Sequence, residues 1–491
     1  MAWGSQTAFR RSAARRRAAL LAAPLAAALL LTGVARAAGP PPPSEAATPD
    51  ARCGAGDHPE ATQGRAPLAD FRSGRSNVGY TCNAAMVAHF GTTGGYRVYR
   101  YVDRAGHVCG YYDTTLLFPA NAANPTHRTG VFVLDMSNPA KPVLTDDLVT
   151  PAMQTPHESL SLNIRRGLLA ADLGNPATYP GWVDIYSIAD DCLHPTLDSS
   201  TPVGVLGHEG TFSPDGNTFW VTSVMGNLTA LDVSNPTVPK ILYDNLSVKP
   251  HGLNVSDDGR TLYFADLGPS HGLTILDVSQ VQARRSSPAA PQIDHLTWDN
   301  VSIPQVPIPV TIKGHHYLVE IDEYTAGTGF NSGYDPSAKV GAARIIDIAD
   351  PSRPRVVSNI RLQVNQEANR AGDQRNDPDA TSSLQGYAGH YCGVPQRQDP
   401  GIVACSFIES GLRVFDIRDP YHPREIAYFN MPPKTGQKSA TSSGYSASFA
   451  MSQPAFDVQR GQIWYSDGNS GLYVVQLRHG VWPFGPTQTR G

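Results

Sequence analysis

The sequence predicts an all-β protein, a seven-bladed β-propeller built from four-stranded antiparallel blades. Three observations predict it: one short phrase occurs seven times along 491 residues, each unit except the last holds four strand-like segments, and one more such segment precedes the first unit. Repetition at a period of about 45 residues is typical of propellers, in which each unit forms one blade.

The repeated phrase begins with Gly and ends with Asp, often followed by Asn or Asp and then Pro. Two clear copies are GVFVLDMSNPAKP from Gly130 and GLRVFDIRDPYHP from Gly411. Apolar and polar residues alternate within it, which is typical of a half-buried strand, and Gly suits the tight turn before that strand. We expect the Asp to shape the turn that follows. Its position is filled in the seven copies by Asp135, Tyr186, Asp232, Asp277, Asp347, Asp416 and Gln476.

A hairpin precedes the phrase and a further strand follows it. The segment HEGTFSPDGNTFWVTS from His208 is a strand, an Asp-Gly turn and a second strand. The last copy has no strand after it, and residues 83–90 (NAAMVAHF) resemble the missing one. We therefore expect the ring to be closed by an N-terminal strand, which would leave no open sheet edge. The alternative, a pair of β-sandwiches, does not explain the regular four-strand units.

The phrase resembles the LVIVD repeat of bacterial secreted or surface β-propellers. GLTILDVS from Gly272 is the copy most similar to that repeat. The resemblance implies a propeller over residues 77–478, followed by a C-terminal tail at 479–491. It implies little chemistry, because the family is largely uncharacterised.

The N-terminal region predicts export. Residues 1–37 contain a cluster of Arg, an apolar stretch and an Ala-Arg-Ala site, the pattern of a secretory signal peptide cleaved after Ala37. A membrane anchor is the alternative, but the apolar stretch is short and Ala-rich. We expect residues 38–76, Pro- and Ala-rich at their start, to be a flexible leader. We expect the mature protein to be secreted, extracellular or in the cell envelope. Either the general or the twin-arginine export route could carry it.

Charge restricts the possible partners. The chain has 39 Lys plus Arg and 43 Asp plus Glu, and residues 1–37 hold six Arg and no acid, so the mature chain has a net charge of −10. This argues against nucleic acid, which needs a basic face. No later stretch is apolar and long enough to span a bilayer. We expect a monomer that binds a protein or a small-molecule ligand.

Six cysteines in an exported chain predict three disulfides. Cys392 and Cys405 flank a segment that could form one hairpin. Cys82 and Cys109 bracket the proposed closing strand, so a bond between them would lock the ring. By elimination, Cys53 would pair with Cys192. No Cys-x-x-Cys spacing suggests zinc or redox chemistry.

Four units begin their first strand with His, and these residues are candidate metal ligands: His157, His208, His251 and His390. First strands line a propeller's channel, so the imidazoles could converge on one Cu, Fe or Zn ion. Carboxylates could join them or lie behind them and fix their tautomers. The candidates are Glu158 and Glu209, which follow two of the histidines, and Asp172, Asp266 and Glu409, which end second strands.

A structural role is the alternative for the same residues. In WD-repeat propellers, a His and an Asp at comparable positions hold each blade together and bind nothing. Structural histidines would point along their own blade, with His157 facing Asp172, His251 facing Asp266 and His390 facing Glu409. Metal ligands would instead converge on a common point.

Long insertions gather on the face where the histidines lie. They span residues 323–341, 365–389 and 431–452, and long loops in compact domains often carry function. The candidate binding residues of this face are Tyr324, Phe330, Tyr334, Tyr387 and Tyr391. No nucleophile elbow, Walker loop or supported GxGxxG motif is present. We therefore place first a ligand- or protein-binding scaffold that uses this face; the alternative is a metal-dependent oxidoreductase with a His-ligated ion in the channel.

Overall fold

The computed structural model describes residues 43–114, 129–173, 181–203, 207–223, 226–325, 334–377, 380, 386–431 and 448–484. The predicted signal peptide at 1–37 and the predicted binding residue Phe330 lie outside these ranges. The described residues belong to one compact unit, which begins at Pro42.

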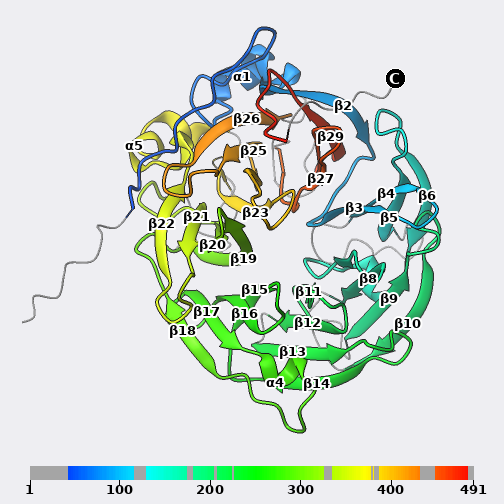
Figure 1. Cartoon of the computed structure of the whole chain (residues 1–491). Coiled ribbons are helices and arrows are strands. Elements are labelled where there is room, and N and C mark those ends of the chain that lie inside the picture. The colour runs from blue at the N-terminus through cyan, green and yellow to red at the C-terminus, as the bar shows by residue number, and fades with distance from the viewer. Residues whose placement is uncertain are drawn as a thin grey trace, which may run out of the picture. The chain divides into compact units, whose positions relative to one another are not determined.

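Seven antiparallel sheets follow one another around a common axis in this unit (Figure 1). We number them as blades one to seven in chain order. Each of the first six blades runs through four consecutive strands, and neighbouring strands pair antiparallel. The prediction of a seven-bladed propeller with four-stranded blades is confirmed.

The strands of blades one to four are as follows. Blade one contains β3 (Val98–Val102), β4 (Val108–Asp113), β5 (Val131–Asp135) and β6 (Val143–Leu148). Blade two contains β7 (Ser161–Asn163), β8 (Leu168–Asp172), β9 (Trp182–Ser187) and β10 (Thr196–Pro202). Blade three contains β11 (Gly210–Phe212), β12 (Thr218–Ser223), β13 (Asn227–Asp232) and β14 (Lys240–Asn245). Blade four contains β15 (Pro250–Val255), β16 (Thr261–Asp266), β17 (Gly272–Asp277) and β18 (Gln292–Leu296).

The remaining blades complete the ring. Blade five contains β19 (Ile303–Ile312), β20 (His315–Glu323), β21 (Ala343–Asp347) and β22 (Arg355–Ile360). Blade six contains β23 (Gly389–Gly393), β24 (Ile402–Phe407), β25 (Gly411–Asp416) and β26 (Arg424–Asn430). Blade seven contains β27 (Ala455–Asp457), β28 (Gln462–Asp467) and β29 (Gly471–Leu477).

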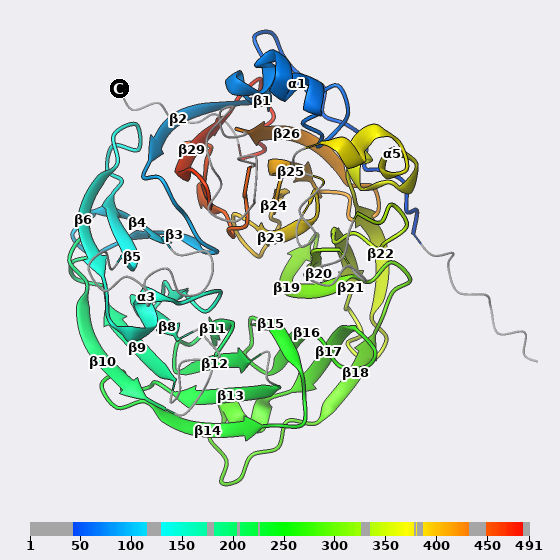
Figure 2. The ribbon, with the colours of Figure 1, turned by 180° about the vertical axis from the view of Figure 1, so that it is seen from behind.

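Two strands from the N-terminal side join the last two blades. β2 (Ala84–Phe90) pairs antiparallel with β29 and is the outer strand of blade seven, so the blue and red ends of the colour scale meet there (Figure 1). β1 (Tyr80–Cys82) pairs with β26 as a fifth strand of blade six, next to the helix α1 (Leu68–Ser73) (Figure 2). The chain thus crosses from blade six to blade seven before it starts blade one.

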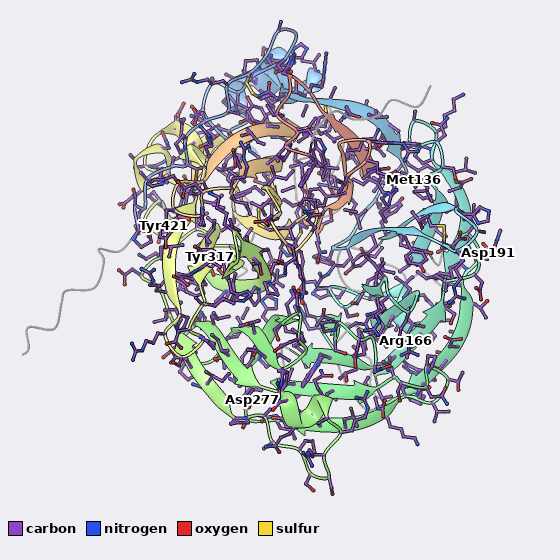
Figure 3. The ribbon with its side chains drawn as sticks, viewed as in Figure 1. Met136, Arg166, Asp191, Asp277, Tyr317 and Tyr421 are labelled. Atoms are coloured by element: carbon purple, nitrogen blue, oxygen red, sulfur yellow. A yellow bond between two sulfur atoms is a disulfide. The ribbon has the colours of Figure 1, made fainter. Side chains whose placement is uncertain are left out.

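The repeated phrase forms the third strand of each blade, and its Asp shapes the following turn. In blade four, the carboxylate of Asp277 accepts the backbone N–H of Ser279, where α4 (Ser279–Gln282) begins (Figure 3). Asp135, Asp232, Asp347 and Asp416 accept the N–H two residues ahead in the same way. This Asp is therefore used for turn geometry, as expected.

Residues 43–76, assigned from the sequence to a flexible leader, pack against blade six. Glu60 accepts hydrogen bonds from Arg413, and Gln63 donates to Glu425 at 3.0 Å. Both Gln63 and Arg413 are buried. The guanidinium of Arg413 is buried on β25 and takes its acidic partners partly from the leader, so the leader packs against this blade. No periodicity in the sequence reveals these contacts.

Two of the three predicted disulfides are wrong. The structure joins Cys53 to Cys82 and Cys109 to Cys192, so the predicted Cys82–Cys109 and Cys53–Cys192 bonds do not form. The packed leader brings Cys53 to the end of β1, and Cys109 on β4 faces the residues that follow β9 in blade two. The Cys392–Cys405 bond is confirmed and links β23 to β24.

Buried side chains fill the spaces between adjacent blades. The largest apolar cluster joins blades five and six through residues such as Val319, Ile345 and Phe407. Among the described residues, we find no helix with the length and apolar character needed to cross a membrane.

Candidate metal centre at the axis of the ring

The four candidate histidines lie at the starts of the inner strands of four blades. His157 lies four residues before β7 and His208 two residues before β11, whereas His251 lies in β15 and His390 in β23. Glu158 forms a parallel β-bridge with Glu209, which aligns the entries to blades two and three. The propeller symmetry therefore brings residues from distant parts of the chain to one place.

Backbone carbonyls orient two of the imidazoles. His251 Nδ1 lies 2.7 Å from the carbonyl oxygen of Pro304, and His390 Nδ1 lies 2.8 Å from that of Met451. An imidazole that donates from Nδ1 leaves the lone pair of Nε2 available when the ring is neutral. The carbonyls thus prepare both Nε2 atoms to act as ligands.

The Nε2 atoms converge on two carboxylates. His208 Nε2 and His251 Nε2 are 2.9 Å apart, and they lie 3.0 and 3.6 Å from Glu158 Oε2. His390 Nε2 lies 3.3 Å from Glu158 Oε1 and 3.0 Å from Glu323 Oε2. Glu323 Oε1 lies 3.6 Å from His251 Nε2. We call His208, His251, His390, Glu158 and Glu323 the axial cluster.

These separations match the edges of a coordination polyhedron. With metal–ligand bonds of about 2.1 Å, neighbouring ligands are about 3.0 Å apart in an octahedron and about 3.4 Å apart in a tetrahedron. The axial cluster has donor–donor distances from 2.9 to 3.6 Å. Each of these neighbouring pairs of donors is therefore spaced as two ligands of one ion would be.

Several polar atoms of the cluster lack a hydrogen bond. Among the described residues, neither Glu158 Oε2 nor His390 Nε2 makes one, although both are buried and close to the other donors. Leaving a buried polar group unsatisfied costs about 1–3 kcal/mol. A cation between these atoms would satisfy them together.

The carboxylates and imidazoles of the axial cluster shift one another's pKa values. Burial alone would lower the pKa of His251, but Glu323 and Glu158 raise it to about 9. Burial likewise lowers the pKa of His390, but its contacts with the carboxylates of Glu158 and Glu323 raise that pKa to about 9. Burial would raise the pKa of Glu158, yet the imidazoles around it, His208 first, hold that pKa well below its ordinary value.

His157 lies at the more open side of the cluster. Its ring contacts that of His208, with centroids 4.3 Å apart, and burial together with this neighbour lowers the pKa of His157 to about 3. Its backbone has φ of 49°, a left-handed conformation that costs energy for a residue other than Gly. His157 and His208 are partly exposed, while His251, His390, Glu158 and Glu323 are buried.

A polar network supports Glu158 from behind. Gln305 Nε2 donates to Glu158 Oε1 at 2.7 Å, and Arg97 Nε donates to the Glu158 carbonyl at 2.9 Å. Arg97 also pairs with Glu209 at 3.0 Å, and the Tyr391 hydroxyl donates to Glu209. Burial raises the pKa of Glu209 to about 7. Glu209 therefore belongs to this supporting network rather than to the axial cluster.

The predicted acids behind the histidines are located elsewhere. Asp266 accepts hydrogen bonds from Thr274 and from the Gly268 N–H, so its predicted pairing with His251 is wrong. Asp172 lies buried against Gly207, and Glu409 is buried in the turn between β24 and β25. Carbonyls take the place of these acids, because the ring nitrogens point toward the neighbouring blade.

Two of the predicted aromatic binding residues are buried. Tyr387 is 4% exposed and Tyr391 is fully buried, so neither presents its ring to a partner. Tyr324 and Tyr334 are partly buried against the cluster between blades five and six. Tyr387 donates instead to the carbonyl of Ala66 in the leader.

Sequence reasoning missed Glu323, the second carboxylate of the axial cluster. It follows Asp322 at the end of β20. Successive strand residues point to opposite faces, so the two carboxylates separate. Asp322 pairs with Arg344 at 3.0 Å, while Glu323 faces the axis. The two adjacent acids at the end of this strand were the sequence signal that could have identified Glu323.

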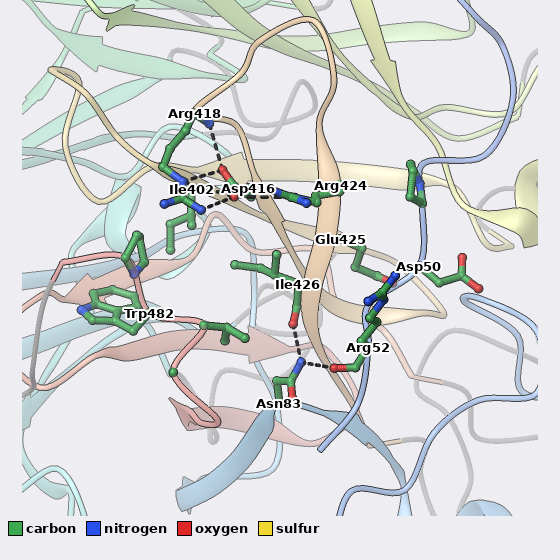
Figure 4. Close-up of a pocket in the computed structure, with 14 residues that line it drawn as sticks. Asp50, Arg52, Asn83, Ile402, Asp416, Arg418, Arg424, Glu425, Ile426 and Trp482 are labelled. Atoms are coloured by element: carbon green, nitrogen blue, oxygen red, sulfur yellow. Dashed lines mark hydrogen bonds and ion pairs between the residues drawn. The ribbon is translucent and has the colours of Figure 1, made fainter. Parts of the chain in front are cut away.

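A separate pocket of about 800 Å³ lies between the leader, blade six and the C-terminal segment (Figure 4). Asp416 pairs there with Arg418 at 2.5 Å and with Arg424 at 3.8 Å. The Arg52 carbonyl accepts from Asn83 at 2.9 Å. Its charged groups compensate one another, in contrast to the axial cluster.

Comparison with known families agrees with the repeat. Residues 127–150 and 215–243 match the LVIVD repeat model, and the matched segments include the third strands of blades one and three. The chain is an LVIVD-repeat β-propeller. A search of curated proteins gave no significant match.

Solved structures resemble the LVIVD propeller at low sequence identity. The β-propeller domain of Myceliophteria thermophila Cps50 (Swd1) aligns with a TM-score of 0.48 and 10% identity, covering 80% of this chain and 99% of that one. Kuenenia stuttgartiensis hydrazine synthase aligns with a TM-score of 0.48 and 10% identity, covering 79% and 97%.

Proposed function

We propose that this LVIVD propeller is an exported metal-dependent enzyme, an oxidoreductase, with one transition-metal ion held at the axis of the ring. The observation that carries the proposal is the convergence of three Nε2 atoms on two carboxylates, with neighbouring donors 2.9–3.6 Å apart. Export is supported by the three disulfides and by the N-terminal sequence pattern.

The donor set favours a redox-active first-row metal. Imidazole nitrogens suit Cu, Fe and Zn, and two imidazoles with one carboxylate on a triangular face are typical of non-haem Fe(II) sites. His208, His251 and Glu158 supply such a face. His390 and Glu323 complete five donors, which leave one position of an octahedron for an external ligand.

The site is arranged for catalysis rather than for a purely structural ion. Structural metal sites are closed by protein ligands, whereas catalytic ones keep an open position. The cluster is buried on the side of Glu158 and His390 and partly exposed at His157 and His208. We place the substrate on that exposed side.

The direct test is the metal content of the purified mature chain, measured by plasma mass spectrometry after expression with Fe, Cu or Zn. We expect about one ion per chain in the wild type and loss of most of it in His251→Ala. His422→Ala is the control, because His422 is exposed on a turn between β25 and β26. Absence of metal from the wild type, or full occupancy in His251→Ala, would refute the proposal.

The scaffold hypothesis now has less support than the metal hypothesis. Two of its five aromatic residues are buried, and part of its loop at 365–389 packs onto the leader, where Asp377 pairs with Arg65 at 2.6 Å. No contact within the described residues favours a particular partner on this face. We therefore place metal-dependent catalysis first.

A further inference from the structure

Tyr96 lies against the axial cluster but has no assigned role. Its ring centroid is 4.6 Å from that of His157 and 5.4 Å from that of His390. The side chain is completely buried. Its backbone is fixed on both sides, because Asp113 accepts the Tyr96 N–H at 2.8 Å and the Tyr96 carbonyl accepts the N–H of Gln453 at 2.7 Å.

The hydroxyl of Tyr96 has no hydrogen-bond partner among the described residues. The phenol lies within electrostatic range of Tyr324 and of the carboxylates of Glu158 and Glu323. A buried donor of this kind normally has a partner, and the missing partner is the unusual feature.

We propose that the Tyr96 hydroxyl donates a hydrogen bond to a small anionic ligand at the open coordination position of the metal. The inference rests on the proposed metal centre and adds a residue to it. Such a donor stabilises negative charge on the bound group without being a metal ligand itself. The rigid backbone and the two flanking imidazoles hold the phenol ready for this contact.

The experiment titrates azide into Cu(II)-loaded wild-type protein and Tyr96→Phe, followed by the azide-to-copper absorption band. Phe keeps the ring packing on His157 and His390 and removes only the hydroxyl. A hydrogen bond to a charged group contributes about 1.5–3 kcal/mol, so we expect azide to bind at least about tenfold more weakly, with unchanged copper content.

Tyr112→Phe is the matched control. Tyr112 is also buried, and its hydroxyl has no hydrogen-bond partner in the described part of the chain, but its ring packs on Phe132 in blade one. This variant should bind azide as the wild type does.

The outcomes separate this inference from the proposed function. Equal azide affinity in Tyr96→Phe and the wild type would overturn the role of Tyr96 and leave the metal centre intact. Loss of copper from Tyr96→Phe alone would also overturn it, because the hydroxyl would then be a ligand. A wild type that binds no metal would refute the metal centre itself.

Discussion

Two clusters of buried carboxylates in this propeller differ in the groups that face the acids. In blade six, Arg413 donates to Glu60 and Glu425 and lies over the ring of Tyr428. At the axis, Glu158 and Glu323 face three imidazoles, each with Nε2 directed inward. The first cluster contains its own permanent cation, and the second does not.

The two clusters differ in the kind of cation that satisfies their carboxylates. Buried carboxylates are costly unless paired, and a guanidinium with five donors in a fixed geometry satisfies them within the fold. Blade five repeats this solution, with Arg344 paired to Glu320 and Asp322. When neutral, imidazoles fixed by carbonyls direct Nε2 lone pairs toward the carboxylate oxygens, an arrangement that a metal ion completes.

The largest expected effect comes from removing the internal cation of blade six. Arg413→Met leaves two buried carboxylates without their cation, and we expect the free energy of unfolding to fall by about 3–5 kcal/mol. Urea-induced unfolding of the purified chain measures it.

Arg424→Met, on the neighbouring strand, is the control for this variant. Its side chain is 65% exposed and its contact with Asp416 spans 3.8 Å, so we expect a loss below about 1 kcal/mol. If Arg413→Met lost no more than this control, the contrast between the two clusters would be wrong.

A second prediction uses the pH dependence of the same cluster. Burial raises the pKa of Glu60 from 4.5 to about 7, although Arg413 opposes this. The folded state therefore favours the protonated acid, and this stabilisation is complete below pH 4.5 and lost as the pH rises through about 7. Relative to Glu60→Gln, the metal-free wild type should lose about 3 kcal/mol between these limits.

Unfolding curves of both proteins at intervals across this pH range provide the check. The comparison of wild type with Glu60→Gln cancels other buried acids such as Asp113, whose pKa burial also raises to about 7. Parallel pH profiles for the two proteins would show that Glu60 is ionised throughout.

The third prediction concerns the axial cluster, where removing a carboxylate should affect binding and not stability. Glu323→Gln should weaken metal binding by about 100-fold or about 2.7 kcal/mol, since changes even behind metal ligands cost about 10–100-fold. Above a pH of about 9, where His251 and His390 are neutral, the metal-free variant should be as stable as the wild type, because Glu158 loses a like-charged neighbour.

Calorimetric metal titration and metal-free unfolding together test this prediction. Glu367→Gln is the control, because Glu367 is exposed on α5 (Glu367–Arg370). A large loss of metal-free stability in Glu323→Gln would instead assign Glu323 a structural ion pair.

Periodicity predicted the parts of the fold that repeat. The third strand of each blade and the turn role of its Asp follow from alternation and turn chemistry, and they hold in the structure from Asp135 to Asp416. The meeting of the four histidines also follows from their equivalent places in the units. Each of these predictions needs only local sequence and ring symmetry.

The errors concern residues whose position no repeat specifies. The leader carries Cys53 and Glu60 to blade six through contacts with a single blade, so its disulfide could not be derived from spacing. Tyr391 follows a candidate ligand and was assigned to the surface, but an inner strand is buried on both of its faces. Glu323 was missed because it directly follows Asp322, and only the alternation of side chains along the strand directs the two carboxylates to opposite faces.

Anomalous X-ray diffraction from crystals grown with the bound metal, recorded on both sides of its absorption edge, tests the central claim most directly. The account predicts one strong peak about 2.0–2.2 Å from the Nε2 atoms of His208, His251 and His390 and from a Glu158 oxygen. A map without a peak, with His251 and His390 hydrogen-bonded to Glu158 and Glu323 instead, would contradict it.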